Sequence, residues 1–310
     1  MPRGPVQTGI LLVDKPAGMT SHDVVSRVRR AFGQREVGHA GTLDPAATGL
    51  LVMALGDATR LLRFVEAAEK AYAGTVRLGR ATTTWDAEGD TTEEVAAPRD
   101  IDPAALEAAL ASLTGTITQS VPAFSAVKVD GVRAYARARK GEAVEVPKRE
   151  VTVSSIAAVR VAPPDIDIVA TVSKGTYVRT LAVDLGAKLG FPAHLCALRR
   201  TRIGRFSVDA AYPLESLEGA QLLPAADACL HLVEIRIDLR ALDDVRHGRA
   251  LSAEAVLGGA SGDFAADASL RIVAPDGSLA AIAEARASRE ALASFAPRDA
   301  AVRYACVLAK

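Results

Sequence analysis

The chain has 310 residues and carries 37 acidic and 37 Lys or Arg side chains, so its formal net charge is zero. Hydrophobic residues make up 49% of the sequence and charged residues 24%, which is typical of a globular protein and excludes a disordered or fibrous one. No apolar run approaches the ~20 residues of a membrane-spanning helix, and residues 1–9 lack the apolar segment of a secretory signal, so we expect a cytoplasmic protein without membrane attachment.

The first predicted elements are a short buried strand at residues 9–13 and a helix that follows a loop containing Pro and Gly. Ser21 is a suitable N-cap for this helix. Val24, Val28 and Phe32 recur at four-residue spacing, which places one apolar stripe of the helix inward.

Residues 34–49 are predicted to form one long loop. They hold three glycines and a proline, show no periodicity, and lie between the helix and an apolar strand at residues 50–55. A loop of this length is commonly functional or disordered.

Helices and strands then follow one another without the regular repetition of a parallel βαβ protein. Apolar residues recur every third or fourth position in the predicted helices and every second position in the strands. The predicted helices cover residues 59–68, 103–113 and 177–189, and the predicted strands cover residues 71–78, 115–118, 144–161 and 166–173. A connection made of a helix and a loop is expected at residues 213–228.

Short strands dominate the sequence after residue 230 and predict a second domain. They are expected at residues 233–237, 269–277 and 303–309, with a turn region at residues 246–251. The predicted domains are therefore residues 1–230 and 231–310.

The cysteines and histidines do not indicate a metal or redox site. Cys196, Cys229 and Cys306 are far apart and none forms a CxxC pair, and the five histidines show no HxxH or HExxH spacing. We expect reduced, structural cysteines and no bound metal.

The zero net charge conceals an uneven distribution. Residues 174–205 carry seven basic side chains against one acid, and residues 128–150 carry seven against four, whereas residues 86–107 carry eight acids against one arginine. This pattern predicts a dipolar molecule with one face suited to phosphate, although an ordinary solvated surface would also fit it.

Asp44 stands in the most informative segment, GHAGTLDPAATG at residues 38–49. Its glycines permit unusual backbone angles and close approach of a ligand, and Pro45 biases Asp44 toward an extended conformation. Such a loop can hold one carboxylate rigidly, but Asp-Pro in a Gly-rich loop is also typical of a simple turn.

This segment closely resembles the catalytic motif of the TruB family of tRNA pseudouridine synthases. The resemblance extends in matching order and spacing to residues 9–25, 70–89, 121–141, 173–186 and 197–206. It implies an α+β fold in which a mixed, mainly antiparallel sheet is flanked by helices. It also implies that residues 1–230 are the catalytic domain and residues 231–310 a small β-rich, PUA-like domain.

The activity that the resemblance implies is the isomerisation of uridine 55 in the TΨC arm of tRNA to pseudouridine. The base is detached from its ribose at nitrogen, turned over and rejoined through carbon, a reaction that needs no cofactor. Asp44 would carry the chemistry, either as a nucleophile toward the ribose or the base, or as a base that removes a ribose proton. The target nucleotide would first be flipped out of the RNA stack.

Two further catalytic residues follow from the resemblance. Arg179 is expected to pair with Asp44, because a guanidinium keeps a carboxylate ionised and oriented; a phosphate contact is the alternative. Tyr72 would stack on the flipped base and relay a proton, unless it is an ordinary aromatic residue of the core.

Four more residues are implied to bind the substrate. His39 would hold the distorted RNA loop, and Tyr177 and Leu198 would line the base pocket, with a place in the core as the alternative for Leu198. Lys15 would support the loop or the RNA.

Two other functions stay open on the sequence. One is a tRNA-folding chaperone that binds the same arm, and the other is the catalytic subunit of a guide-RNA particle, which the absence of long basic extensions disfavours. Residues 231–310 carry ten basic and eleven acidic side chains, so this domain either reads the shape of the tRNA acceptor end or stabilises the catalytic domain. We expect a monomer with tRNA as its partner and no obligate protein partner.

Overall fold

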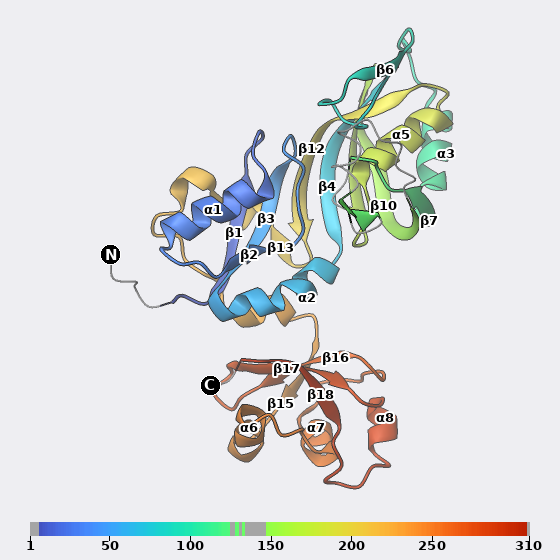
Figure 1. Ribbon diagram of the computed structural model, residues 1–310. Helices are drawn as coiled ribbons and strands as arrows, with labels where there is room; N and C mark the ends of the chain where they lie inside the picture. Colours follow the sequence, from blue (N-terminus) through green and yellow to red (C-terminus); the bar gives the residue numbers. More distant parts are fainter. Residues whose placement is uncertain (1–5, 125–127, 130–131, 134–146, 309–310) are drawn as a thin grey trace.

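The computed structural model of the protein describes residues 6–124, 128–129, 132–133 and 147–308. These residues form a large sheet flanked by helices and a smaller four-stranded sheet near the C-terminus (Figure 1). The predicted α+β class, with a mixed, mainly antiparallel sheet and a β-rich C-terminal domain, is confirmed. No helix in the described ranges is long and apolar enough to cross a membrane.

The large sheet has ten described strands in the order β14-β1-β3-β12-β4-β11-β10-β7, with β2 paired to β3 and β13 to β12. Neighbouring strands are antiparallel except for two pairs, β1 with β14 and β3 with β12. The strands are β1 (Gly9–Lys15), β2 (Val37–His39), β3 (Thr48–Leu55), β4 (Lys70–Leu78), β7 (Gly115–Ser120), β10 (Lys148–Ala162), β11 (Asp165–Val172), β12 (Ala193–Ile203), β13 (Phe206–Ser207) and β14 (Tyr212–Pro213). Two hairpins lie outside this sheet: β5 (Arg80–Thr82) with β6 (Thr91–Glu94), and β8 (Lys128–Val129) with β9 (Val132–Arg133).

One half of the large sheet is covered on both faces, which explains the continuous apolar sequences of β1 and β3. Leu11 and Val13 pack in the cluster that contains α1 (Ser21–Ala31). Ile10 and Leu12 point to the other face, toward the 3₁₀ helix η1 (Gly56–Leu61) and α2 (Leu62–Ala67). Alternate residues of a strand face opposite sides of a sheet, so this half has two cores.

The other half of the sheet forms a separate core with α3 (Pro103–Ser112) and α5 (Val178–Lys188). Helix α3 begins after Asp102, whose side chain accepts hydrogen bonds from the Ala104 and Ala105 amides. Leu181 and Leu185 of α5 are fully buried against β4, β11 and β12.

The two halves meet at a short parallel contact between β3 and β12. Only two residue pairs form it, Thr48 with Arg199 and Gly49 with Arg200. Gly49 has φ +100°, and a Cβ at this position would lie 2.3 Å from the Arg200 carbonyl oxygen. The glycine is therefore required here, and the loop that precedes β3 lies over the centre of the sheet.

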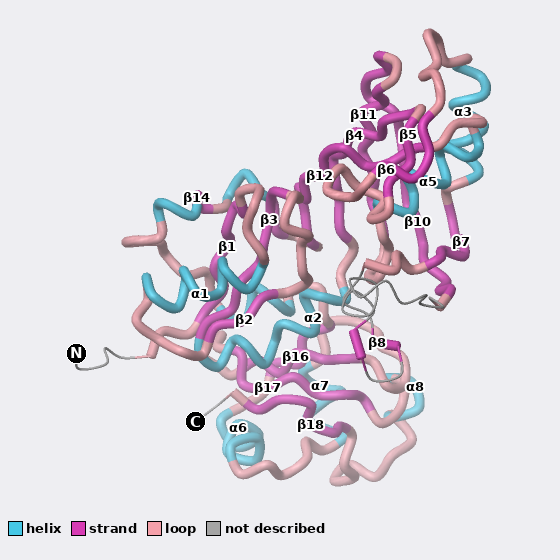
Figure 2. The backbone as a smooth tube through the Cα atoms, turned by 45° about the horizontal axis from the view of Figure 1, so that its top comes forward, coloured by secondary structure: helices cyan, strands magenta, loops and turns pink. Residues whose placement is uncertain are grey.

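The C-terminal sheet has the order β15-β16-β17-β18 and is accompanied by short helices. Its elements are β15 (Val233–Arg236), α6 (Leu239–Arg246), α7 (Ala253–Gly259), β16 (Ser269–Val273), β17 (Leu279–Ala285), α8 (Arg289–Leu292) and β18 (Val302–Val307). In both views this sheet lies beside α2 (Figures 1 and 2). Arg60 and Arg63 donate hydrogen bonds across the junction to the carbonyls of Val307 and Ala305, at 2.7 and 3.1 Å.

Several sequence expectations were wrong in detail. Residues 34–49 are not a continuous loop, because Val37–His39 forms β2 beside β3. Residues 213–228 contain no α-helix within the described chain: Pro213 ends β14, and the helical turns that follow are the 3₁₀ turns η3 (Leu214–Ser216) and η4 (Ala225–Cys229). The N-cap of α1 is Thr20, whose side chain accepts from the Asp23 amide while the Asp23 carboxylate accepts from the Thr20 amide.

The remaining differences concern unpredicted helices and the bounds of predicted elements. The C-terminal domain contains helices α6, α7 and α8 that the strand pattern did not predict. The strand predicted at residues 144–161 runs over Lys148–Ala162, and residues 144–146 lie outside the described ranges, as does most of the predicted basic segment 128–150. The predicted domain boundary at residue 230 falls between η4 and β15.

Candidate active site

The loop that carries Asp44 is fixed on both sides of the aspartate. Before it, the Ser21 hydroxyl accepts a hydrogen bond from the Leu43 amide at 2.9 Å and donates to the Leu43 carbonyl at 3.2 Å. After it, the Pro45 carbonyl accepts from the Gly18 amide at 2.9 Å and from the Lys15 ammonium at 3.0 Å. The backbone around Asp44 is therefore held in one position before any ligand binds.

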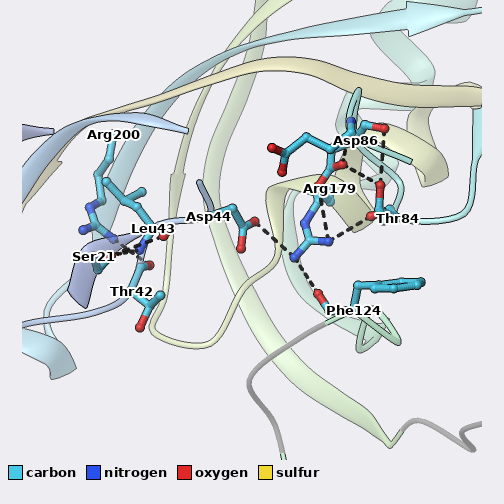
Figure 3. A network of polar contacts seen from close by, with 10 residues as sticks. Ser21, Thr42, Leu43, Asp44, Thr84, Asp86, Phe124, Arg179 and Arg200 are labelled. Carbon is cyan, nitrogen blue, oxygen red and sulfur yellow. Dashed lines mark hydrogen bonds and ion pairs between the residues drawn. The ribbon is translucent and has the colours of Figure 1, made fainter. Parts of the chain in front are cut away.

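Arg200 holds the beginning of the same loop. Its guanidinium donates to the carbonyls of Gly41 at 2.9 Å and Leu50 at 2.8 Å. It also donates to the Thr42 carbonyl at 3.4 Å (Figure 3). Because Arg200 is 1% exposed and belongs to β12, it ties the loop to the central strand of the sheet.

Arg179 lies beside Asp44, as expected from the sequence. Its Nη2 is 3.1 Å from Asp44 Oδ2 and donates to the Phe124 carbonyl at 3.0 Å. Its Nη1 donates to the Thr84 carbonyl at 2.8 Å and lies 3.5 Å from Asp86 Oδ2 (Figure 3). The guanidinium is thus a buried bridge between two carboxylates and two carbonyls, a geometry that a lysine could not reproduce.

The Asp44 carboxylate is partly open to solvent although protein surrounds it. Its side chain is 41% exposed, whereas that of Arg179 is 5% exposed. The pKa of Asp44 is raised above its ordinary value, chiefly because the surrounding protein desolvates the carboxylate. The charge of Arg179 lowers this pKa, that of Asp86 raises it, and that of Lys15 lowers it. The site therefore balances desolvation of the carboxylate against one strong cationic partner.

A pocket of about 300 Å³ opens beside Asp44 and brings together most of the predicted site residues. This base pocket is lined by Asp44, Tyr72, Tyr177, Arg179 and Leu198, together with basic residues discussed below. Its volume lies at the lower end of ligand pockets in proteins.

Its two tyrosines come from different elements. Tyr72 is on β4, and Tyr177 is the N-cap residue of α5. The Arg149 guanidinium lies 5.4 Å from the centre of the Tyr177 ring, and Arg149 also donates to the Gly175 carbonyl at 3.3 Å. This contact orients one aromatic wall of the pocket.

His39 lies outside the base pocket, in an adjoining hollow of about 920 Å³. This hollow shares Thr42, Leu43, Asp44 and Arg179 with the base pocket. Burial lowers the pKa of His39, and its Nδ1 has no hydrogen-bond partner among the described residues. A buried imidazole whose burial disfavours its charged form therefore stands next to the loop that carries Asp44.

Lys15 lines neither of these two hollows. Its side chain is fully buried, and its ammonium donates to the carbonyls of Pro16, Met19 and Pro45 at 2.9, 2.7 and 3.0 Å. A lysine ammonium has three donors, so none is left for RNA. Of the two roles expected for Lys15, the geometry fits support of the loop and not contact with a substrate.

Four residues of the site were not singled out from the sequence: Lys70, Asp86, Gln119 and Arg200. Lys70, Asp86 and Arg200 belong to segments that carry the family resemblance, so the motifs could have indicated them. Asp86 also follows Trp85, a non-glycine residue with φ +64°, which marks a strained turn. Gln119 offers no signal, because a polar residue in a short strand is ordinary.

The described residues contain no cluster of three or more His, Cys, Asp or Glu side chains that could hold a metal ion. The constellation instead offers a fixed carboxylate, an arginine partner and two aromatic rings around a small cavity.

Comparison with known proteins decides the family. Residues 29–178 match the profile described as TruB family pseudouridylate synthase (N terminal domain). Residues 179–238 match that of the tRNA pseudouridylate synthase B C-terminal domain. The tRNA pseudouridine synthase B of Leifsonia xyli subsp. xyli (strain CTCB07) is 48% identical over 291 residues, which cover 91% of this chain and 94% of that protein. The chain belongs to the TruB family.

Other relatives agree with this membership. The tRNA pseudouridine synthase B of Thermobifida fusca (strain YX) is 48% identical over 288 residues, covering 90% of this chain and 94% of that protein. The resemblance to the TruB family in the sequence motifs is thereby confirmed.

Solved structures show the same fold in more distant proteins. A chain in the crystal structure of the archaeal box H/ACA sRNP Nop10-Cbf5 complex matches with a TM-score of 0.76 and 24% identity, over 97% of this chain and 86% of that one. A chain of a Cbf5-Nop10-Gar1 complex matches with a TM-score of 0.76 and 25% identity, over 96% of this chain and 83% of that one. These proteins therefore share the fold of nearly the whole chain.

Proposed function

We propose that this protein is a tRNA pseudouridine synthase that isomerises uridine 55 of the TΨC arm, with Asp44 carrying the chemistry. The observation that supports this most directly is the placement of Asp44. A rigid loop and the buried Arg179 hold its carboxylate at the wall of a small pocket lined by two tyrosines. The TruB membership supports the reaction, and this geometry supports Asp44 as the group that performs it.

The reaction breaks the bond between ribose C1′ and base N1 and forms one between C1′ and base C5. N1 gains a proton and C5 loses one, so nothing is oxidised or hydrolysed and no cofactor is required. Whether Asp44 attacks as a nucleophile or removes a ribose proton, it must be ionised. Arg179 supports this state because its charge lowers the pKa of a carboxylate that burial would otherwise keep protonated more readily.

The target uridine must leave the RNA stack before it can enter the base pocket. Unstacking is unfavourable, and stacking of the base on an aromatic ring returns about 1–3 kcal/mol. In our proposal Tyr72 provides the stacking face and a hydroxyl that relays the C5 proton, Tyr177 and Leu198 complete the pocket, and His39 contacts the displaced RNA loop.

The direct test is to incubate the purified protein with an unmodified tRNA transcript and to label pseudouridine by a mass-shift reaction. We expect one pseudouridine at position 55 with no guide RNA added, and a rate at least about 1000-fold lower for Asp44→Asn. Absence of pseudouridine with the wild type, or full activity of Asp44→Asn, would refute the proposal. A requirement for added guide RNA would point instead to a guide-dependent enzyme.

Loss of activity in Asp44→Asn is not expected to come from unfolding. Because the pKa of Asp44 is raised in the folded protein, its ionised form costs stability at pH values above that pKa. The cost disappears as the pH falls below the ordinary aspartate pKa of 3.8. At neutral pH an asparagine removes it, so the melting temperature should be unchanged or higher.

A second candidate function is a tRNA-folding chaperone. The observation in its favour is the hollow beside the base pocket, which at about 920 Å³ is larger than the base pocket and extends the concave surface past Asp44. Measured tRNA binding and refolding by Asp44→Asn would separate the functions. A chaperone retains both in this variant, whereas failure to bind would exclude it.

A further inference from the structure

One end of the base pocket collects positive charge. This basic end consists of Lys70, Lys174 and Arg200, with Glu66 as its one acid, and it lines the same cavity as Asp44 and Tyr72. Figure 3 places Arg200 and Arg179 on opposite sides of Asp44, so the basic end is distinct from the arginine that pairs with the aspartate.

The two buried cations of the basic end have no carboxylate partner among the described residues. Lys70 is 7% exposed, and its ammonium donates to the carbonyls of Glu66 at 2.8 Å and Ala68 at 2.9 Å. Arg200 donates only to carbonyls, as described above. Buried charges in proteins are normally paired, so this concentration of unneutralised charge beside a cavity points to an anion from outside.

The two cations are also close to each other. A Cβ built on Gly41 would lie 3.6 Å from Arg200 Nη1 and 3.6 Å from Lys70 Cε. One donor of the Lys70 ammonium remains without a partner in the described part of the chain, on a residue that lines the cavity. The site thus has a free donor as well as charge.

The electrostatics of Lys70 agree with this interpretation. The pKa of Lys70 is lowered to about 8, chiefly by burial and then by the charge of Arg200; Glu66 raises it and Lys174 lowers it. These are the charged groups that face the ammonium from β12, from the loop before α5 and from α2. A phosphate in contact with Lys70 would counteract all three lowering effects.

We propose that the basic end is a binding site for one backbone phosphate of the RNA, held by Lys70 with Lys174 at its rim. Lys70 and Tyr72 are alternate residues of β4, so they share a face of the strand about 7 Å apart. A base stacked on Tyr72 would thereby have a phosphate of its own segment of backbone next to Lys70. This inference rests on the proposed function, because it assigns the phosphate to the substrate of the same pocket.

The test measures binding without catalysis, in the Asp44→Asn background. Stem-loop RNAs with the sequence of the TΨC arm are made with a neutral methylphosphonate at one linkage at a time around the target uridine. Their Kd values are compared for proteins with and without Lys70→Met. With unmodified RNA we expect Lys70→Met to weaken binding about 10-fold and to reduce the slope of log Kd against log salt by about 1.

The decisive result is coupling at one linkage. With the RNA whose contacted phosphate is already neutral, Lys70→Met should cost no further affinity. Equal weakening of every RNA by Lys70→Met, or no weakening of any, would overturn the proposal. Lys188→Met is the matched control, since it removes an exposed lysine at the C-terminal end of α5 and should show no coupling to that linkage.

A second variant covers the case in which Lys70→Met does not fold, as judged by circular dichroism. Lys174 is exposed, so Lys174→Ala leaves the core intact and should couple to the same linkage more weakly. Absence of coupling for Lys174→Ala in that case overturns the proposal. These outcomes are distinguishable from failure of the proposed function, which fails if the wild-type protein makes no pseudouridine or if Asp44→Asn is fully active.

Discussion

Asp44 shows how a single charge is set by its neighbours. Desolvation raises its pKa, Arg179 and Lys15 lower it, and Asp86 raises it from the far side of the Arg179 guanidinium. Asp86 therefore has two opposing effects: it anchors the arginine that supports Asp44, and its own negative charge disfavours ionisation of Asp44.

The first prediction concerns the acid limb of the pH profile. If the ionised Asp44 is required, the single-turnover rate falls as the pH drops through the Asp44 pKa, which lies above 3.8. Asp86→Asn removes one cause that raises this pKa, so its acid limb should move to lower pH. Asp90→Asn is the control, because this exposed residue lines the adjoining hollow without contacting Arg179, and its limb should not move. An acid limb displaced to higher pH in Asp86→Asn would contradict the prediction.

At the scale of elements, the start of α5 depends on one buried side chain of β7. Gln119 is fully buried; its Nε2 donates to the Tyr177 carbonyl at 3.3 Å, and its Oε1 accepts from the Tyr177 amide at 3.0 Å. Tyr177 lines the base pocket, and Arg179 follows two residues later. The strand thereby positions both an aromatic wall and the partner of Asp44.

We predict that Gln119→Leu slows the reaction more than its loss of stability explains. The change leaves the Tyr177 amide without a partner, at about 1–3 kcal/mol, and the Tyr177 carbonyl keeps only its bond from the Leu181 amide, so Tyr177 is freer to shift. Misplacement of this kind can lower the single-turnover rate about 10- to 100-fold.

The matched control is Thr180→Val, which removes the hydrogen bond from the Thr180 hydroxyl to the Ser120 carbonyl at the same junction. It should lower the melting temperature with little effect on the rate. If each variant slows the reaction only in proportion to the decrease in its melting temperature, Gln119 has only a structural role.

The elements also show what the sequence can predict. Helices α1 and α5 were predictable because their apolar residues recur over three turns, and β1 and β3 because both their faces are buried. Strand β2 has three residues, too few to display a period. The start of helix α6 was predictable, because the Asp238 side chain accepts a hydrogen bond from the Ala241 amide. The helix was missed because the neighbouring sequence is typical of short strands.

Some residues of the site could likewise be predicted from the sequence, and others could not. Asp44 and Arg179 were identifiable because they belong to motifs that carry the family resemblance. Gln119 could not be found, because its partner Tyr177 lies 58 residues further along the chain and only the packing of α5 on β7 brings them together. The basic end likewise exists only when β4, β12 and the loop before α5 are assembled.

At the scale of the whole molecule, the C-terminal domain is joined to the part of the chain that forms the large sheet through a shared core. Ile282 of β17 and Cys306 of β18 belong to the same buried cluster as Leu61 of η1 and Phe64 of α2. Arg60 and Arg63 add hydrogen bonds to β18 carbonyls. Glu66, one turn later in α2, lines the base pocket. A nearly neutral domain can therefore influence the site by holding α2 in place.

The last prediction tests this mechanical link with two matched core truncations. Ile282→Ala and Ile272→Ala both remove a fully buried isoleucine from the C-terminal domain, and each should cost about 2–5 kcal/mol. Ile272 packs only within that domain, whereas Ile282 faces η1 and α2. Ile282→Ala should therefore increase amide hydrogen exchange across residues 56–67 and weaken tRNA binding, while Ile272→Ala increases exchange only beyond residue 230. Unchanged exchange at residues 56–67 in Ile282→Ala would show that the part of the chain that forms the large sheet holds α2 without help, leaving contact with RNA as the role of the C-terminal domain.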